Sequence, residues 1–556
     1  MAGEKSNEAQ PDLVSPGPLD DGALSATPRS QEPGLEELPP KEPISETSGS
    51  DDDDNPKYSV FTPWEKRGIV LGAAIGALFS PLSAQIYLPA LPAVAADLGV
   101  SISEINLTIT TYMVFQGITP MVIGSLADSA GRRPAYGICF VLYILANIGC
   151  ALAPNYKSLL VLRMLQSAGA SSTIVLCQAV VADIATSAER GTYVAYTSLP
   201  GMLGPCIGPV VGGVLAQYLG WRWIFWLLAI MAIAVFAASA AFLPETCRYV
   251  VGDGSVLPPP AYRTLWQLWK DSSARRRKGS PARSDGGEGG HDVSSASQPS
   301  SLPKKEKFNV FRSLVLLFEA EMFLLLAYGA VVYAGVYAAM ASMGTQLQVV
   351  YGLSQAEVGL LYLPISGGML LSAVAIGRAL DWNYRRHRRR HDLSGGGDFP
   401  IERARLEVGA PLVALSCVVI AAWGWALETS VPLAVTCVLL ALLGFGVVGF
   451  TNASSALITD LNPGNAAAAA ASNNITRCLV GAAATAVIDP LIRVVGLGWA
   501  FVLFGALFAV LSPSMWLVMR NGPGWRKAKA ERRRVRRERK AGGVDGQADS
   551  QETLRG

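Results

Sequence analysis

Charged residues are scarce in this chain. Only 16% of its 556 residues are Asp, Glu, Lys or Arg, whereas 51% are hydrophobic. Ordinary soluble domains are about 25% charged. The charges gather in residues 1–67, 244–313, 378–408 and 520–556, which leaves long apolar stretches between them. Because one bilayer span needs about 20 apolar residues, this composition excludes an ordinary soluble protein and predicts a membrane protein.

Residues suited to metal or nucleophilic chemistry are also few. The three histidines, His291, His387 and His391, lie in polar stretches, which argues against a metal site or a histidine-based triad in the apolar body. The eight cysteines include no CxxC pair, so we expect neither a disulfide framework nor a zinc site. We therefore expect no metal, no cofactor and no enzymatic activity. No secretory signal is visible near Met1, so the first membrane helix is expected to direct insertion.

Twelve apolar segments are long enough to cross a bilayer. Helices are expected because open strands would leave backbone groups unpaired in lipid. The sequence thus predicts an all-α integral membrane protein. Its predicted spans are 68–91, 105–126, 135–153, 158–181, 192–216, 223–243, 317–342, 357–379, 409–427, 431–455, 466–490 and 497–519.

Polar stretches divide the spans into two sets of six. We expect a disordered tail over residues 1–66, since it is rich in Pro, Ser and acidic residues. The first six-helix half follows at 67–243, and a Gly/Ser-rich linker is expected at 244–316. The second half covers 317–520, and residues 521–556 form a basic tail.

Positive charge favours one side of the membrane. Arg132, Arg133, Arg190, the run at 275–278 and "RRHRRRH" at 385–391 all lie in alternate connections, whereas 93–104 and 344–356 contain no Lys or Arg. The positive-inside bias therefore places the basic connections and both termini in the cytoplasm. We interpret these clusters as topology signals that also attract anionic lipid. The expected macromolecular partner is a lipid bilayer and not a nucleic acid.

The two halves contain similar segments at matching positions. "GSLADSAGRR" at 124–133 follows the second span, and "GRALDWNYRR" at 377–386 follows the eighth. Gly124 and Asp128 are matched by Gly377 and Asp381. This match favours an internal duplication, as parallel repeats are common in transporters.

Residues 64–526 resemble the major facilitator superfamily. The segment 124–133 matches that family's Gly-x-Leu-Ala-Asp-x-x-Gly-Arg-Arg pattern between helices two and three. From the residues alone it is either a solvated hinge or a charge cluster between helix ends. The resemblance favours the second interpretation, a gating cluster that holds the two halves together on the cytoplasmic side. Its expected members are Gly124, Asp128, Gly131, Arg132, Arg133, Asp183, Glu189, Arg190 and Asp381.

The fifth span resembles the family's antiporter motif. "LPGMLGPCIGPVVGG" at 199–213 has small residues that permit close helix packing and prolines that permit a bend. Its motif residues are Gly204, Pro205, Gly208, Pro209, Gly212 and Gly213. "FSPLSAQIYLPAL" at 79–91, "DFPIERARLEVGAP" at 398–411 and "NNITRCLVGAAATA" at 473–486 are similar to fungal drug:proton antiporters, especially the quinidine-resistance and citrate-exporter branch. The resemblance implies proton-coupled export of drugs, organic acids, polyamines or secondary metabolites.

Two arginines lie within apolar spans and indicate a substrate site. Arg163 is in "VLRMLQSAGASS" at 161–172, and Arg477 is about eleven residues into the eleventh span. Alternatively, Arg163 extends to the outer interface, or Arg477 pairs with a helix dipole or a carbonyl. If both arginines face one cavity, their paired N–H donors favour a carboxylate. The predicted site comprises Ser83, Gln85, Tyr87, Tyr112, Gln116, Arg163, Gln166, Asn473, Asn474 and Arg477.

Three carboxylates are candidates for carrying a proton: Glu319, Glu321 and Asp489. A desolvated carboxylate can exchange protons near neutral pH, although acids at a membrane interface are commonly just solvated. We predict a monomeric secondary transporter of the plasma membrane, or of an internal one, that exports an organic acid or amphipathic metabolite in exchange for protons. The alternatives are an uptake symporter for a small organic solute and a sensor with the same fold that does not transport.

Overall fold

The computed structural model describes residues 59–186, 189–252, 256, 258–259, 262–264, 319–393, 399–462, 466–529 and 531. The tail up to residue 58, most of the linker 244–316 and nearly all of the tail beyond Lys529 lie outside this part of the chain. The boundaries predicted for these segments therefore stay predictions. Within the described residues the regular elements are all helices.

Six long helices form the first group. They are α1 (Pro63–Gln85), α3 (Ile102–Ala130), α4 (Arg132–Ala151), α5 (Tyr156–Ile184), α6 (Arg190–Tyr218) and α7 (Arg222–Phe242). Between α1 and α3 the chain forms a 3-10 helix, η1 (Leu88–Ala90), and then α2 (Leu91–Leu98); α8 (Arg248–Val251) follows α7.

The second group has the same number of membrane-length helices. It contains α11 (Ala320–Tyr351), α12 (Gln355–Leu360), α13 (Tyr362–Leu393), α14 (Ile401–Glu428), α15 (Leu433–Leu461), α16 (Ala466–Val495) and α17 (Leu497–Leu511). Helices α12 and α13 together make one span, Gln355–Arg390, and the last span continues from α17 to Lys529.

Local sequence determines where several of these helices begin. Thr62, Ser101 and Ser354 each accept a hydrogen bond from a backbone N–H three residues later, where a glutamate bonds back to the cap. These capping boxes satisfy backbone donors that have no partner inside the helix. They begin α1, α3 and α12 just before their apolar residues.

Within the described part of the chain, twelve helices have the length and composition to cross a membrane, which confirms the predicted number of spans. Three details of the prediction are wrong. The first span bends at η1 and continues to Leu98. Helix α13 extends through the basic run at 385–391, expected to be a connection, so His387 is helical. The last helix likewise enters the basic tail. Arginine and lysine are good helix formers, so these helices can continue beyond the apolar stretch.

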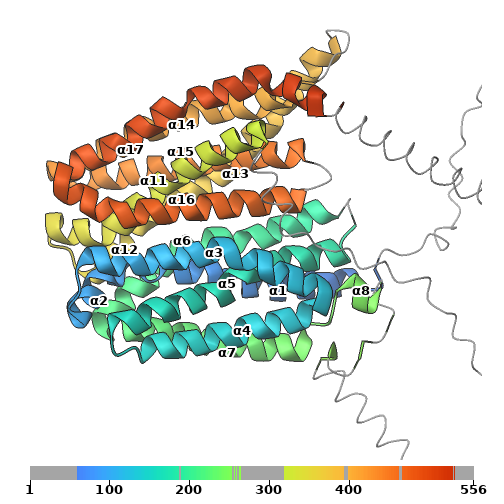
Figure 1. Ribbon diagram of the computed structural model, residues 1–556, viewed down its shortest axis with the longest axis horizontal. Coiled ribbons are helices and arrows are strands. Elements are labelled where there is room, and N and C mark those ends of the chain that lie inside the picture. Colours follow the sequence, from blue (N-terminus) through green and yellow to red (C-terminus); the bar gives the residue numbers. More distant parts are fainter. Residues whose placement is uncertain are drawn as a thin grey trace, which may run out of the picture. The chain divides into compact units, whose positions relative to one another are not determined.

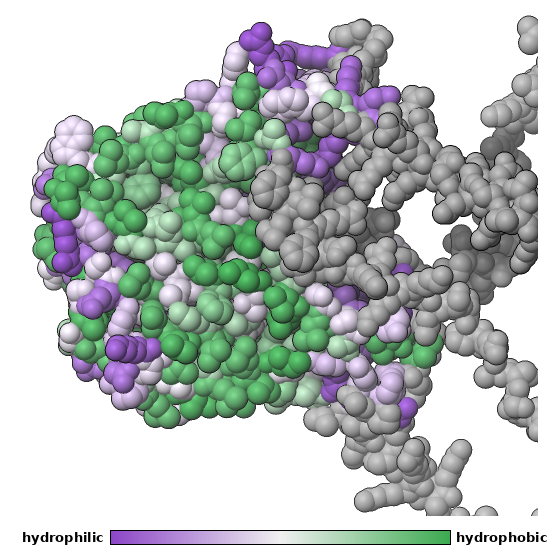
Figure 2. Space-filling model, viewed as in Figure 1, coloured by the Kyte–Doolittle hydropathy of each residue, from purple (hydrophilic) through white to green (hydrophobic). Residues whose placement is uncertain are grey.

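The helices pack as two groups that follow the order of the chain (Figure 1). In the first group α1 contacts α5 and α6, α5 contacts α3 and α4, and α4 contacts α7; in the second, α15 contacts α13 and α14, and α11 contacts α16. Between the groups, α3 packs against α16, and α6 packs against α12 and α13. Figure 2 shows hydrophobic residues across the middle of the helices and hydrophilic ones gathered toward the helix ends, as expected for a surface that faces lipid.

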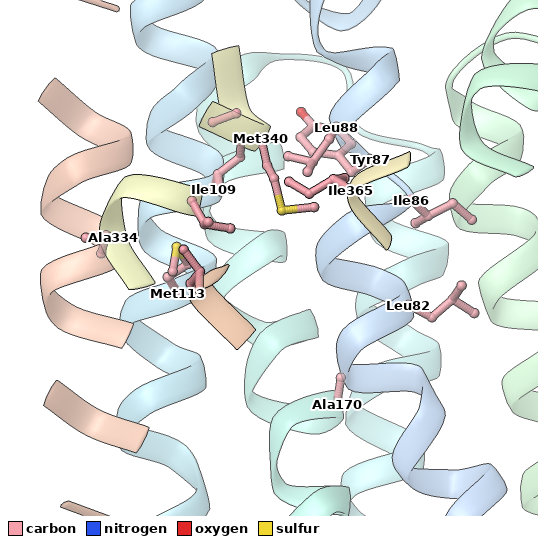
Figure 3. Packing of buried hydrophobic residues seen from close by; sticks show 14 of the residues in the cluster. Leu82, Ile86, Tyr87, Leu88, Ile109, Met113, Ala170, Ala334, Met340 and Ile365 are labelled. Atoms are coloured by element: carbon pink, nitrogen blue, oxygen red, sulfur yellow. The ribbon is translucent and has the colours of Figure 1, made fainter. Parts of the chain in front are cut away.

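Buried side chains from both groups meet near η1. Figure 3 shows Leu88 and Ile109 of the first group together with Met340 and Ile365 of the second, all members of one hydrophobic cluster. A Cβ added to Gly344 of α11 would lie 2.7 Å from the Leu88 carbonyl oxygen, so the two backbones are in direct contact. The groups are therefore packed together toward the end of the bundle opposite the basic connections, which we call the η1 end.

Candidate functional site

Arg163 lies in the interior of the first group. It is 1% exposed, and its guanidinium is 4.5 Å from the ring centroids of both Tyr87 and Tyr112. Nη1 donates to Gln166 Oε1 at 2.5 Å and to the Ser83 carbonyl at 3.5 Å. Nε and Nη2 have no hydrogen-bond partner among the described residues. The interpretation in which Arg163 extends to the membrane interface is therefore wrong, because the side chain is enclosed between two aromatic rings.

A chain of hydrogen bonds holds this arginine in place. Gln166 donates to Asn147 Oδ1 at 2.7 Å, and Asn147 donates to the Tyr143 carbonyl at 2.7 Å. The Tyr143 hydroxyl is 2.5 Å from Ser83 Oγ. The network thus links α1, α4 and α5, and its satisfied members fix the rotamer of Gln166 against Arg163.

Arg477 is the corresponding charge of the second group. It is half-buried on α16, 4.5 Å from the ring centroid of Tyr333, and its Nη2 donates to Asn474 Oδ1 at 3.1 Å. Its Nε has no hydrogen-bond partner among the described residues. The Tyr333 ring packs on that of Tyr337 at 4.5 Å. Arg477 as a whole is more exposed than Arg163, although its Nε is buried.

Two hydrogen bonds between the groups lie beside these arginines. Gln85 of α1 donates to the Tyr337 hydroxyl of α11 at 3.4 Å. Asn474 of α16 donates to the Gln116 carbonyl of α3 at 3.2 Å. The Oε1 atoms of both glutamines are buried with no partner among the described residues. The interface between the groups therefore contains unused polar atoms close to Arg477.

Most of the predicted site residues lie in one of these two clusters. Ser83, Tyr87, Tyr112 and Gln166 surround Arg163, whereas Gln85, Gln116 and Asn474 lie at the interface of the groups. Asn473 is half-buried beside Asn474, with no hydrogen bond from its side chain to the described residues. Arg163 is buried and Arg477 is half-buried, and the two lie in separate clusters of side chains, so the single cavity between them stays a prediction.

Four members of these clusters are not among the site residues predicted from the sequence: Tyr143, Asn147, Tyr333 and Tyr337. Tyr143 and Asn147 are four residues apart, as are Tyr333 and Tyr337, and this spacing puts two side chains on one face of a helix. That spacing, in segments with few polar atoms, was the available signal. It does not say which helix the polar face meets.

The gating cluster is built around Arg132 at the start of α4. Its Nε donates to Asp183 Oδ2 of α5 at 2.9 Å, and its Nη1 pairs with Asp128 of α3. The backbone N–H groups of Arg132 and Arg133 donate to Glu245, at 2.9 and 3.1 Å. A carboxylate at this helix N-terminus satisfies backbone donors and complements the helix dipole. Glu245, a residue absent from the predicted cluster, is therefore part of it.

The two glycines of this cluster differ in how closely they are packed. Gly131 has φ = +103°, and a Cβ there would be 2.7 Å from Glu245 Oε2. A Cβ on Gly124 would be 3.5 Å from Val175 of α5, an ordinary contact. Only Gly131 is thus required by backbone conformation and by space.

The other predicted side chains contact residues outside this cluster or lie on another helix. Arg133 donates through its guanidinium to the carbonyls of Ala240 and Arg263. Glu189 pairs instead with Lys66 of α1 at 3.0 Å, and this hydrogen bond holds the pKa of Glu189 below its ordinary value. Asp381 is on α13 of the second group, and the side chain of Arg190 lies outside the described residues.

We call the end of the bundle opposite the η1 end the basic end. Each ion pair between described residues at this end joins two residues of the same group of helices. Arg132 with Asp128 and Asp183 belongs to the first group, and the second group contains its own pairs: Arg405–Asp460, Arg526–Glu402 and Lys529–Glu319. The expected bridge between the two halves is therefore not formed by the described side chains in this conformation. The cluster joins α3, α4 and α5 instead.

The glycines of α6 fit against two neighbours. Added Cβ atoms at Gly204, Gly208 and Gly212 would lie 2.6, 3.1 and 1.8 Å from atoms of Pro81 or Ile86, so this face packs on the end of α1. A Cβ at Gly213 would lie 2.4 Å from the Gln355 carbonyl of α12. The Pro205 carbonyl accepts from Ser366 of α13 at 2.8 Å. A further contact between the groups joins Pro209 to Gly359, where a Cβ would lie 2.5 Å from the Pro209 oxygen.

The three candidate proton carriers have different surroundings. Glu319 pairs with Lys529, and Asp489 pairs with Arg493 at 2.9 Å. Glu321 is 8% exposed, and its Oε1 has no hydrogen-bond partner among the described residues. Within the same part of the chain no group of three or more His, Cys, Asp or Glu residues is placed to hold a metal ion.

Comparison with known proteins agrees with this architecture. The family model described as Major Facilitator Superfamily matches residues 73–485. The chain is 39% identical over 491 residues to the MFS-type transporter phiD of a fungal species, covering 86% of this chain and 72% of that protein. It is 34% identical over 524 residues to citrate exporter 1 of Aspergillus niger, covering 91% and 95%.

Among solved structures, the fold is similar to the xylose transporter XylE from E. coli in a partially occluded inward open conformation. The TM-score is 0.55 and the identity 14%, over 82% of this chain and 97% of that one. The chain therefore belongs to the major facilitator superfamily, as a membrane transporter of a fungal efflux-type group and not an enzyme.

Proposed function

We propose that this transporter exports an organic anion, or an amphipathic metabolite with an acidic head group, in exchange for protons. The observation that carries this proposal is Arg477, a half-buried residue whose buried Nε–H has no hydrogen-bond partner among the described residues at the interface between the groups. None of the ion pairs between described residues includes Arg477 or Arg163. An intramembrane cation without a protein carboxylate is suited to a carboxylate of the solute.

The aromatic rings beside it extend the site toward amphipathic solutes. Tyr333 packs against the guanidinium, and Tyr337 presents a hydroxyl toward Gln85. Such rings offer an apolar face with a polar edge. An acid with an apolar body would place its carboxylate on Arg477 and its body on the tyrosines. The name of the citrate exporter supports an organic acid as the first candidate.

Transport proceeds by alternating access in this proposal. The two groups contact each other mainly in the half of the bundle that includes the η1 end. Leu88–Gly344 and Thr110–Thr485 are two of these contacts. With the basic connections in the cytoplasm, as the charge bias favours, this conformation is closed to the outside. Opening that end requires α6 to separate from α12 at Gly213.

Glu321 is the proton carrier that this geometry favours. A buried carboxylate with an unpaired oxygen is costly as an anion, which promotes protonation. Glu319 and Asp489 are each held by a cation. Arg526, Lys529 and Glu402 also lie at this end of the second group, and their charges would shift as the group moves.

The test is flux in proteoliposomes that contain the purified full chain. A proton gradient with the acidic side opposite the labelled acid should drive its accumulation against a concentration gradient, and a protonophore should abolish that accumulation. Citrate and a series of mono-, di- and tricarboxylates serve as solutes. A symporter would accumulate solute on the side toward which protons flow, and a sensor would bind the solute without flux; either result would contradict the proposal.

The proposed location and oligomeric state have separate tests. Fractionation of cells that carry a tagged chain would test the proposed plasma membrane location. Light scattering in detergent would test whether the protein is a monomer.

A further inference from the structure

An arginine-lined hollow lies on the basic extension of α13. It is an open space of about 490 Å³ along one side of this single helix, lined by Asp381, Trp382 and five arginines: Arg378, Arg385, Arg386, Arg389 and Arg390. Asp381 is its single carboxylate, so the lining carries a net charge of about +4 at neutral pH. The transport site proposed above uses none of these side chains.

Glu407 of α14 lies close enough to Arg386 to offset part of the charge of this hollow. Glu407 accepts from His387 at 2.6 Å and from Asn383 at 3.2 Å. None of the ion pairs between described residues includes Arg378, Arg385 or Arg389. Like charges kept this close repel one another, so a polyanion would be favoured in the hollow.

The same face of α13 continues into an apolar surface. Leu371 and Val374 are 63% and 50% exposed, and Trp382 is 63% exposed between them and the outer arginines. Leu371, Val374, Arg378, Trp382, Arg385 and Arg389 are spaced by three or four residues, which places them on one side of the helix. A tryptophan between an apolar and a basic segment is typical of the level of lipid head groups.

We propose that this hollow binds the head group of a multiply phosphorylated inositol phospholipid, with the acyl chains along Leu371 and Val374. Arginine forks recognise phosphate oxygens in pairs, and basic clusters just beyond a membrane helix on the cytoplasmic side attract such lipids. Three of the arginines, Arg378, Arg385 and Arg389, are in none of the ion pairs between described residues, and together they match a head group with several phosphates better than one with a single charge. The proposal rests on the cytoplasmic placement of the basic end and is independent of the transported solute.

The experiment measures lipid binding to the purified full chain in neutral detergent by native mass spectrometry. The probes are phosphatidylinositol bisphosphate, phosphatidylserine and soluble inositol trisphosphate. We expect the bisphosphate lipid to bind at least tenfold more tightly than the other two. The double variant Arg385→Gln/Arg389→Gln should weaken its binding about 30-fold, since each arginine near an anionic lipid contributes roughly fivefold.

The matched control is Arg388→Gln/Arg403→Gln, which removes the same charge from exposed positions outside the hollow. It should change binding less than about threefold. All four arginines are exposed, so gel filtration is expected to show folded protein for both variants. Equal weakening by both double variants would overturn the proposal, because general attraction to positive charge would then explain binding. Equally tight binding of phosphatidylserine, or of soluble inositol trisphosphate, would overturn it as well.

Discussion

Replacing Arg477 tests the central claim about the transported solute. In the structure its Nη2 is used by Asn474, whereas Nε is free among the described residues. A carboxylate of the solute would accept from Nε–H and from a guanidinium nitrogen beside it. A hydrogen bond to a charged group contributes about 1.5–3 kcal/mol, so two such bonds contribute at least about 3 kcal/mol.

That free energy predicts a large loss of affinity. Since about 1.4 kcal/mol is a factor of ten, Arg477→Gln should raise the half-saturating concentration of an organic acid more than about 100-fold. Arg477→Lys keeps the charge but not the planar fork, and retaining one bond should limit the loss to about tenfold. If the arginine binds the carboxylate through two hydrogen bonds, affinity for the acid should therefore fall in the order wild type, Arg477→Lys, Arg477→Gln.

The assay is exchange of labelled acid across proteoliposomes, measured over a concentration series for each variant. Arg520→Gln is the control, because Arg520 is exposed and stacks on Trp516 away from the interface of the groups. Protein amount and unfolding midpoint should match the wild type in every preparation. If Arg477→Gln transports all tested acids with wild-type affinity, or if Arg520→Gln loses as much, the assignment of the anion site is refuted.

Three further predictions concern packing, the gating cluster and the proton. Gly212→Ala should destabilise the protein by about 1–3 kcal/mol or more through overpacking against α1. Gly201→Ala, which has no atom within 4 Å of the added Cβ, should leave the unfolding midpoint unchanged or slightly raised, because alanine is the better helix former. An equal fall of the midpoint in both variants would contradict the packing. Asp183→Asn breaks the ion pair with Arg132, whose side chains are 10–11% exposed, and should lower the free energy of unfolding by about 3–5 kcal/mol. Asp128, at 42% exposure, is less buried, so Asp128→Asn should lower it by at most about 1 kcal/mol and should mainly slow turnover. Thermal unfolding and kcat of the two variants test this order. Glu321→Gln should abolish proton-driven accumulation and preserve solute exchange without a gradient, and the reverse pattern would exclude it as the carrier.

The sequence by itself determined the class of fold and its membrane spans. Apolar runs long enough for a bilayer must form helices in lipid, so twelve spans followed from length and composition and are confirmed. The capping boxes at Thr62, Ser101 and Ser354 are equally local. The end of α13 differs from the prediction because arginines continue a helix readily outside lipid, so a charged run does not by itself end one.

Only the tertiary structure decided which polar residues meet. Arg163 and Arg477 were recognisable from their positions in apolar spans, yet their different exposure depends on aromatic rings from other helices. Glu245 has no local motif, and it reaches Arg132 only because α7 packs beside α4. Helix periodicity states which side of a helix is polar, but the partner of that side is set by packing between segments up to hundreds of residues apart. That packing depends on shape and close contact, as at Gly212 and Ile86, which a pattern along one helix does not contain.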